Sequence, residues 1–262
     1  MSRYFVEVKY KGTLYSGFQK QQNAGSVQEE IEKAFGIFFR NSFQMTCSSR
    51  TDTGVHALQN FLHFDYEGSI TDENSIYNIN AILPPDIVVK KIYLVQNQSH
   101  CRFDATCRTY QYYIHRKKDP FLKEIAYFYP FRLDMDILKQ SALLIKDHAD
   151  FTSFSKRRTQ VKTFTCNILD SKWKMQGDLF VYSVKANRFL RGMVRGLVGT
   201  MLLAGRKKIS LSGFEEILNS SQSSKADFSV PGHGLFLAAV EYPESVFQEK
   251  VLPVFPKDQL NI

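Results

Sequence analysis

Hydrophobic and polar residues alternate along several short stretches of the chain, and such alternation is typical of half-buried β-strands. These stretches predict strands at residues 4–10, 60–66, 86–95, 108–116, 165–175, 179–186 and 233–242, with a short strand near 43–47. Apolar residues spaced three and four positions apart instead predict helices at residues 27–38, 72–82, 133–146 and 188–204, with a shorter helix near 212.

Local signals mark where several of these elements begin or turn. Ser26 with Glu29 matches the capping box, in which a serine hydroxyl accepts a hydrogen bond from the first turn of a helix, and Ser212 is placed in the same way. Gln-Gly-Asp at residues 176–178 predicts a hairpin turn between two strands. The order strand, helix, strands, helix, strand occurs about twice, which favours two α+β halves that meet between residues 97 and 110.

Composition excludes some classes of protein. With 262 residues, 44% of them hydrophobic, the chain can form a sizeable core in one large domain or two smaller ones. It has no run of the roughly 20 apolar residues that a membrane span needs, and its first residues alternate instead of forming a signal peptide. We therefore expect a cytoplasmic protein. The cysteines form no C-x-x-C pair, so we expect neither a metal site nor a disulfide; they are Cys47, Cys101, Cys107 and Cys166.

The chain is also basic and rich in aromatic residues. Its formal net charge is +8, and aromatic residues make up 14% of it. Lysine and arginine bind phosphates and aromatic rings stack on bases, so the composition is consistent with a protein that binds nucleic acid. A solvated basic surface and a phenylalanine-rich core account for the same totals, and composition leaves both interpretations open.

The densest group of chemically active residues lies in SSRTDTGVHALQN, residues 48–60. Asp52 begins the tripeptide Asp-Thr-Gly of aspartic proteases, but such an enzyme needs two carboxylates that share a proton, and the chain has a single copy. Arg50 and His56 flank Asp52 and favour its ionised form, which opposes proton sharing. Two interpretations stay open: a turn that merely needs Asp and Gly, or a loop that presents an ionised carboxylate as nucleophile or base.

Arginines and glycines recur at regular intervals in KANRFLRGMVRGLVG, residues 185–199. The arginines share one face of the predicted helix and the glycines have a similar spacing; they are Arg188, Arg191, Arg195, Gly192, Gly196 and Gly199. Because glycine destabilises a helix, this run indicates close approach of another backbone. The arginines form either a solvated face or a rigid base that holds a guanidinium against a carboxylate or phosphates.

Tyr110 and Tyr112 lie two residues apart on a predicted strand, so both face the same side. Such a pair packs in a core or, beside Arg108, forms a platform on which bases stack. The chemistry of the residues therefore indicates a basic protein of two α+β halves that acts on RNA or nucleotides, with Asp52 as its reactive group.

Seven segments in the same order give the chain a specific resemblance to the tRNA pseudouridine synthase A family. The signature SRTDTGVHA, residues 49–57, is similar to the family's G-R-T-D-A-G-V-H-A. The other similar segments are YKGTLYSGFQKQ, NAILPPDIVV, FDATCRTYQY, HADFTSF, NRFLRGMVRGLVG and VPGHGLFL. Any one match would be weak, whereas the ordered set is specific.

The resemblance implies a fold and an activity. It implies an α+β fold of two ferredoxin-like halves, residues 1–104 and 105–262, which share a continuous mixed β-sheet with helices packed on it and a basic cleft between them. Members of the family are homodimers that flip uridines out of the anticodon stem-loop of tRNA, at positions 38–40, and convert them to pseudouridine. They use no metal and no cofactor, so the expected partners are tRNA and a second copy of the chain.

The resemblance also assigns roles to individual residues. Asp52 matches the catalytic aspartate, Arg195 the arginine paired with it, and Tyr110 the tyrosine that stacks on uracil. Arg50 matches the arginine that enters the space left by the flipped base, and Leu190 matches an apolar residue of the pocket. The other residues expected to bind substrate are His56, Arg188 and Arg191.

Several positions depart from the family pattern without removing an assigned catalytic residue; they are Lys11, Phe18, Ser49, Thr53 and Gly192. Lys11 and Phe18 lie in a loop expected to contact RNA, and Thr53 adjoins the catalytic aspartate. These departures bear on which uridines are modified rather than on the reaction. The alternative to an active isomerase is an RNA-binding paralogue that has lost turnover.

Overall fold

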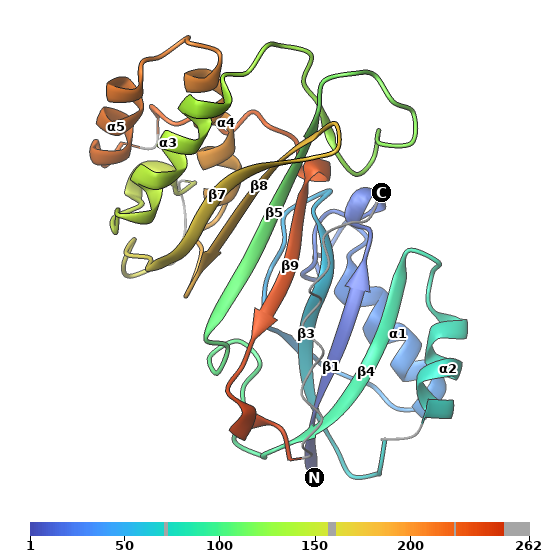
Figure 1. The fold of residues 1–262 in the computed structure, drawn as a ribbon. Helices are drawn as coiled ribbons and strands as arrows, with labels where there is room; N and C mark the ends of the chain where they lie inside the picture. Colours follow the sequence, from blue (N-terminus) through green and yellow to red (C-terminus); the bar gives the residue numbers. More distant parts are fainter. Residues whose placement is uncertain (71–72, 157–160, 223, 249–262) are drawn as a thin grey trace. The chain divides into compact units, whose positions relative to one another are not determined.

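The structure, a computed structural model, describes the whole chain except residues 71–72, 157–160, 223 and 249–262. The chain divides into two compact units (Figure 1). Unit 1 comprises Met1–Thr106 and the described chain from Leu237 onward, and unit 2 comprises Cys107–Phe236. Each unit combines strands with helices, as the sequence predicts for a mixed α/β fold.

The sheet of unit 1 has the strand order β4-β1-β3-β9. Its strands are β1 (Ser2–Tyr10), β3 (His56–Tyr66), β4 (Ile87–Val95) and β9 (Leu235–Glu241), with the short β2 (Thr46–Cys47) beside β3. The central strand β1 pairs antiparallel with both β3 and β4, so Val6 lies between Leu62 and Ile92. β3 begins earlier than the alternation predicts, because Ala57 still pairs with Tyr10 at the end of β1.

Two helices pack against this sheet, α1 (Val27–Phe39) and α2 (Glu73–Ile82) (Figure 1). Ser26 begins α1 as predicted, since its hydroxyl accepts a hydrogen bond from the Glu29 N–H. Phe35 on the buried face of α1 meets the Phe64 ring of β3 edge to face, at 5.5 Å between centroids. α2 contacts both α1 and β4, and the predicted start of this helix, residue 72, lies outside the described residues.

The sheet of unit 2 contains the antiparallel order β5-β8-β7. Its strands are β5 (Cys107–His115), β7 (Ile168–Gln176) and β8 (Leu179–Ala186), and the short β6 (Tyr127–Phe128) pairs parallel with β5. The predicted hairpin turn is confirmed, because Gly177 adopts a φ of 56° between β7 and β8.

The helices of unit 2 are α3 (Met135–Lys146), α4 (Met193–Gly205) and α5 (Leu211–Asn219), and α3 contacts β7, α4 and α5 (Figure 1). The predicted start of α4 at Arg188 is wrong: Gly192 caps the helix with a φ of 74°, so the preceding residues are not helical. The predicted cap of α5 is also wrong, because Ser210, not Ser212, accepts the hydrogen bond from the Gly213 N–H. The short 3-10 turns are Gly12–Leu14, Thr152–Phe154, Gly232–Gly234 and Glu244–Val246.

The chain returns to unit 1 after β9 begins. The Val240 N–H donates to the buried Gln59 side chain, and the Tyr242 hydroxyl donates to the Cys101 carbonyl. The sequence predicts residues 105–262 as one half, and the structure differs because these bonds tie the last described segment to unit 1. Among the described helices, none has both the length and the apolar character needed to cross a bilayer.

Candidate functional site

Asp52 lies in a tight turn that leads into β3, and residues 49–55 are called the Asp52 turn below. The Val55 N–H donates to the Asp52 carbonyl at 3.1 Å, and Gly54 adopts a φ of 74°. That φ is open to glycine and costly for other residues, so the Asp-x-Gly spacing has a conformational reason. The turn leaves the Asp52 side chain half-buried and Arg50 exposed.

Three residues from other elements hold the Asp52 turn in place. The Tyr10 hydroxyl bonds to the Thr51 hydroxyl at 2.8 Å, and the Phe18 N–H donates to the Thr51 carbonyl at 3.1 Å. The Asn60 side-chain amide donates to the Ser49 carbonyl at 3.0 Å. The turn is therefore anchored to β1, to the loop after β1 and to β3, which fixes the backbone on both sides of it.

Two further contacts close the loop after β1 over the Asp52 turn. The Gly12 N–H donates to His56 Nδ1 at 2.9 Å, and His56 is only 1% exposed. His56 therefore positions the turn in this structure, and its predicted contact with substrate stays a prediction. Phe18 is fully buried and its ring lies 5.4 Å from that of Tyr10, so its side chain belongs to the core, and the expected contact of its loop with RNA stays a prediction.

In unit 2, Arg195 occupies the first turn of α4. Its Nε donates to the Val230 carbonyl at 2.7 Å, and its Nη2 lies 3.5 Å from the Phe228 carbonyl. The same segment covers the helix, because a Cβ at Gly199 would overlap with the Asp227 carbonyl oxygen. The glycine spacing correctly predicts this close backbone approach, and the approach fixes the guanidinium on a rigid support.

The predicted helical face of Arg188, Arg191 and Arg195 is wrong, since the first two precede α4. Leu190 between them is buried, whereas Arg188 is half-buried and Arg191 is exposed. Gly192 adopts a left-handed conformation directly before the helix, so this short segment presents its side chains from a loop and turn instead of from a helical surface.

The two tyrosines of β5 have different surroundings. Tyr112 is fully buried and its hydroxyl donates to the Pro231 carbonyl, so it belongs to the core. Burial raises its pKa well above the ordinary value for tyrosine. Tyr110 is half-buried and meets the Phe189 ring edge to face at 5.0 Å. Tyr110 alone of the pair is therefore placed to stack on a ligand.

The predicted site residues thus form two groups. Arg50, Asp52 and His56 lie in unit 1. Tyr110, Arg188, Leu190, Arg191 and Arg195 lie in unit 2. Each group is held by contacts within its own unit, and the predicted pairing of Asp52 with Arg195 stays a prediction.

Among the described residues, His63, His100 and Cys101 are grouped closely enough to share a metal ion, with ligand atoms within 4.8 Å of one another. The Cys101 thiol already donates to the Thr46 carbonyl, and His63 Nδ1 accepts from the Cys101 N–H. Burial above all, with smaller contributions from His100 and Arg3, lowers the pKa of His63 to about 4. Because these bonds already occupy the Cys101 thiol and His63 Nδ1, they favour a structural cluster over a cation site.

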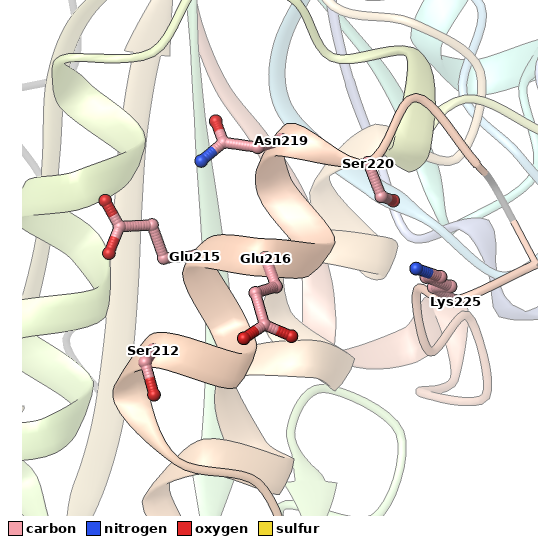
Figure 2. A pocket seen from close by; sticks show the side chains of 6 residues that line it. All are labelled: Ser212, Glu215, Glu216, Asn219, Ser220 and Lys225. Carbon is pink, nitrogen blue, oxygen red and sulfur yellow. The ribbon is translucent and has the colours of Figure 1, made fainter.

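The surface of the described residues includes a larger and a smaller hollow. The larger, of about 610 Å³, lies beside α5 and includes Glu215 and Glu216, with Lys225 reaching toward the helix (Figure 2). None of the predicted site residues lines it, and its carboxylates disfavour RNA. The smaller, of about 250 Å³, lies in unit 1 and is called the Arg102 pocket; its walls include Gln28, Cys47, Arg50, His100, Arg102 and Phe103. Sequence reasoning missed this pocket because its residues come from separate segments.

Over most of its length, the chain is similar in sequence to known proteins of one family. The profile of the family described as tRNA pseudouridine synthase matches residues 7–104 and 148–243. The tRNA pseudouridine synthase A of Parabacteroides distasonis is 44% identical over 248 residues, which are 94% of this chain and 98% of the relative. That of Bacteroides thetaiotaomicron is 42% identical over 253 residues, 95% of this chain and 94% of the relative. That of Francisella philomiragia is 33% identical over 257 residues, 97% of this chain and 100% of the relative.

Proposed function

The chain belongs to the tRNA pseudouridine synthase family, and on that basis we propose that it converts uridine to pseudouridine in the anticodon stem-loop of tRNA. The proposal depends above all on the geometry of the Asp52 turn, which holds a half-buried carboxylate beside an exposed arginine. A carboxylate fixed in this way is preorganised for reaction, because its support does not have to order when substrate binds.

The reaction exchanges one bond of the ribose for another. The bond from C1′ to uracil N1 breaks, a bond from C1′ to C5 forms, C5 loses its hydrogen as a proton, and N1 gains a proton. In the proposal, the Asp52 carboxylate attacks either C1′ or C6 and is released when the new bond has formed. The reaction is an isomerisation, so its electrons balance within the substrate.

Residues of unit 2 take the remaining catalytic roles in this proposal. Arg195, whose guanidinium is anchored on loop carbonyls, faces Asp52 and keeps it ionised in a closed pocket, where an unpaired charge is costly. Tyr110 stacks on the uracil, and its edge contact with Phe189 limits how its ring can turn. Leu190 supplies an apolar wall to the pocket.

The target uridine has to leave the RNA stack before it reaches Asp52, at a cost of a few kcal/mol. Arg50, which is exposed two positions before Asp52, enters the gap and offsets part of that loss. Arg188 and Arg191 contact the RNA backbone. The formal net charge of +8 favours binding to the polyanion and makes the affinity sensitive to salt.

The proposal includes the finer features of the expected assembly. The two units are ferredoxin-like halves that share one continuous mixed sheet, and a basic cleft between them accommodates the anticodon arm. The working form is a homodimer in the cytoplasm. Membership of the family and the charge of the chain support this part of the proposal.

Tritium release tests the reaction directly. The wild-type protein is incubated with tRNA that carries tritium at uridine C5, and pseudouridine formation expels that tritium into water. We expect Asp52→Asn to reduce release by at least about 10³-fold, because the amide neither attacks nor accepts a proton as the carboxylate does. The affinity of this variant for tRNA, measured by filter binding, should stay within about threefold of wild type.

Release that persists in Asp52→Asn would refute the role of Asp52. Wild-type protein that binds tRNA and releases no tritium would instead favour the paralogue without turnover. Chemical mapping of pseudouridines in tRNA from cells with and without the protein then identifies the modified positions.

A further inference from the structure

We propose that the Arg102 pocket binds a second nucleotide of the tRNA, close to the target uridine, with its phosphate against Arg102 and its base against Phe103. The inference rests on the proposed function and adds a subsite to it. The pocket volume of about 250 Å³ suits part of one nucleotide and excludes a duplex. Arg50 lines this pocket and lies two residues before Asp52, so a nucleotide bound here lies near the reacting one in space.

The charge of the pocket favours a phosphate. The described residues that line it include Arg50 and Arg102 and no carboxylate. The adjacent carboxylate of Glu32 accepts hydrogen bonds from the Gln28 amide and the Met45 N–H. A guanidinium binds phosphate through paired, charge-assisted hydrogen bonds, so this lining is complementary to an RNA backbone.

The two arginines of the pocket also act on the buried thiol of Cys47. Burial raises its pKa, while Arg50, which is hydrogen-bonded to the thiol, and Arg102 act in the opposite direction. Cys47 and both arginines line the same pocket, so the pocket carries positive charge before substrate binds and attracts an anion.

Phe103 gives the pocket a surface for a base. Its ring is 74% exposed, although large aromatic side chains usually lie in the core. The His100 ring lies 4.2 Å from it at an interplanar angle of 35°, and the Arg102 guanidinium lies 5.8 Å from its centroid. An exposed ring beside a guanidinium is the arrangement with which proteins stack unpaired bases.

The turn that carries these side chains is ordered before any ligand binds. The Phe103 N–H donates to the His100 carbonyl at 3.1 Å, and the His100 N–H donates to the Asp104 carboxylate at 2.8 Å. Cys101 is fully buried and bonds to Thr46 and His63. Because one residue of the turn is fixed in the core, its neighbours Arg102 and Phe103 project at a set position, which lowers the entropy lost on binding.

His100 completes the site as a hydrogen-bond donor. Its Nδ1 accepts the Arg102 N–H at 3.1 Å, and burial lowers its pKa from the ordinary value for histidine. A neutral ring that accepts at Nδ1 carries its proton on Nε2, so it can donate to a phosphate or base oxygen.

Steady-state tritium release and filter binding with full-length tRNA test the subsite. We expect Arg102→Gln to raise KM and Kd about tenfold, to lower the slope of log Kd against log salt by about one, and to leave kcat within twofold. Phe103→Ala should raise KM about fivefold or more without changing the salt slope, and Phe103→Tyr should restore wild-type KM. Lys33→Gln removes the same charge from the exposed face of α1 and serves as the matched control, with KM within twofold of wild type.

Both test residues are exposed, so their variants should melt like wild type. If Arg102→Gln and Phe103→Ala bind tRNA as tightly as Lys33→Gln does, or if they lower kcat at unchanged KM, the subsite is refuted while the proposed reaction stands. Wild-type protein that releases no tritium refutes the reaction itself, and Kd values for the same variants then decide the subsite separately.

Discussion

At the Asp52 turn, the absence of one methyl group lets two backbone segments touch. Gly12 lies against the Val55 carbonyl, and a Cβ at this position would overlap with the Val55 oxygen. The Gly12 N–H also donates to His56, so the same residue provides both close approach and a hydrogen bond. A residue far from Asp52 in the sequence thus sets the position of the turn that carries it.

We predict that Gly12→Ala lowers the free energy of unfolding by about 1–3 kcal/mol, because the backbone has no free space for the added carbon. It should also lower kcat for tritium release, since relief of the overlap moves the Asp52 turn. Urea denaturation and single-turnover release measure the two effects. Gly25→Ala is the control: a Cβ there meets nothing within 4 Å, and its unfolding free energy should match or slightly exceed wild type. Equal urea midpoints for Gly12→Ala and Gly25→Ala would contradict the steric role of Gly12.

The sequence predicts the Asp52 turn itself because Asp and Gly act locally on backbone conformation. It does not predict the contacts with Tyr10, Phe18 and Asn60, which come from residues distant along the chain. Phe18 shows the difference most clearly. Its segment looks like an exposed loop by composition, yet its ring is fully buried. The burial of a side chain in a loop depends on tertiary contacts, which the local pattern of hydrophobic and polar residues does not predict.

At the scale of elements, the periodic spacing of apolar residues predicts that α4 exists but not where it begins. Its apolar spacing continues upstream of the true start, so the pattern predicts a helix from Arg188. The structure begins α4 at Met193 because Gly192 takes a left-handed conformation. Glycine permits this conformation without requiring it, and the Lys156 side chain packed against Gly192 is part of the context that selects it. The glycine spacing within α4, by contrast, has a direct steric meaning that the sequence reveals.

We predict that Gly199→Ala separates α4 from the segment that starts at Asp227, because the added Cβ overlaps with the Asp227 carbonyl oxygen. The free energy of unfolding should fall by about 1–3 kcal/mol although alanine is the better helix former. Since Val230 of that segment accepts the Arg195 hydrogen bond, kcat for tritium release should fall as well. Gly213→Ala in α5 is the control, with contacts no shorter than 3.3 Å, and should change stability by less than about 1 kcal/mol. Normal stability and normal kcat in Gly199→Ala would show that the segment shifts without consequence.

At the scale of the whole molecule, the order of elements along the chain predicts two parts, and the structure has two compact units. The order does not predict that the chain crosses back into unit 1 at Leu237. β9 alternates like any other strand, and alternation indicates burial of one face without identifying the neighbouring strand. The buried side chain of Gln59 in β3 accepts a hydrogen bond from Val240 of β9. This bond links the two strands, and it is seen only in the folded structure.

Gln59 connects the returning segment to the buried charge of unit 1. Its Oε1 accepts the Val240 N–H at 3.0 Å, and its Nε2 donates to the buried Glu7 carboxylate at 3.1 Å. We predict that Gln59→Leu lowers the free energy of unfolding by about 3 kcal/mol, because both groups lose a partner in the core. Gln96→Leu is the control: it removes an exposed hydrogen bond to Ser245 of the same segment and should cost less than about 1 kcal/mol. Urea denaturation measures both. Limited proteolysis should cut residues 237–248 faster in the Gln59 variant alone, and equal cutting in the two variants would mean that this amide does not hold the returning strand.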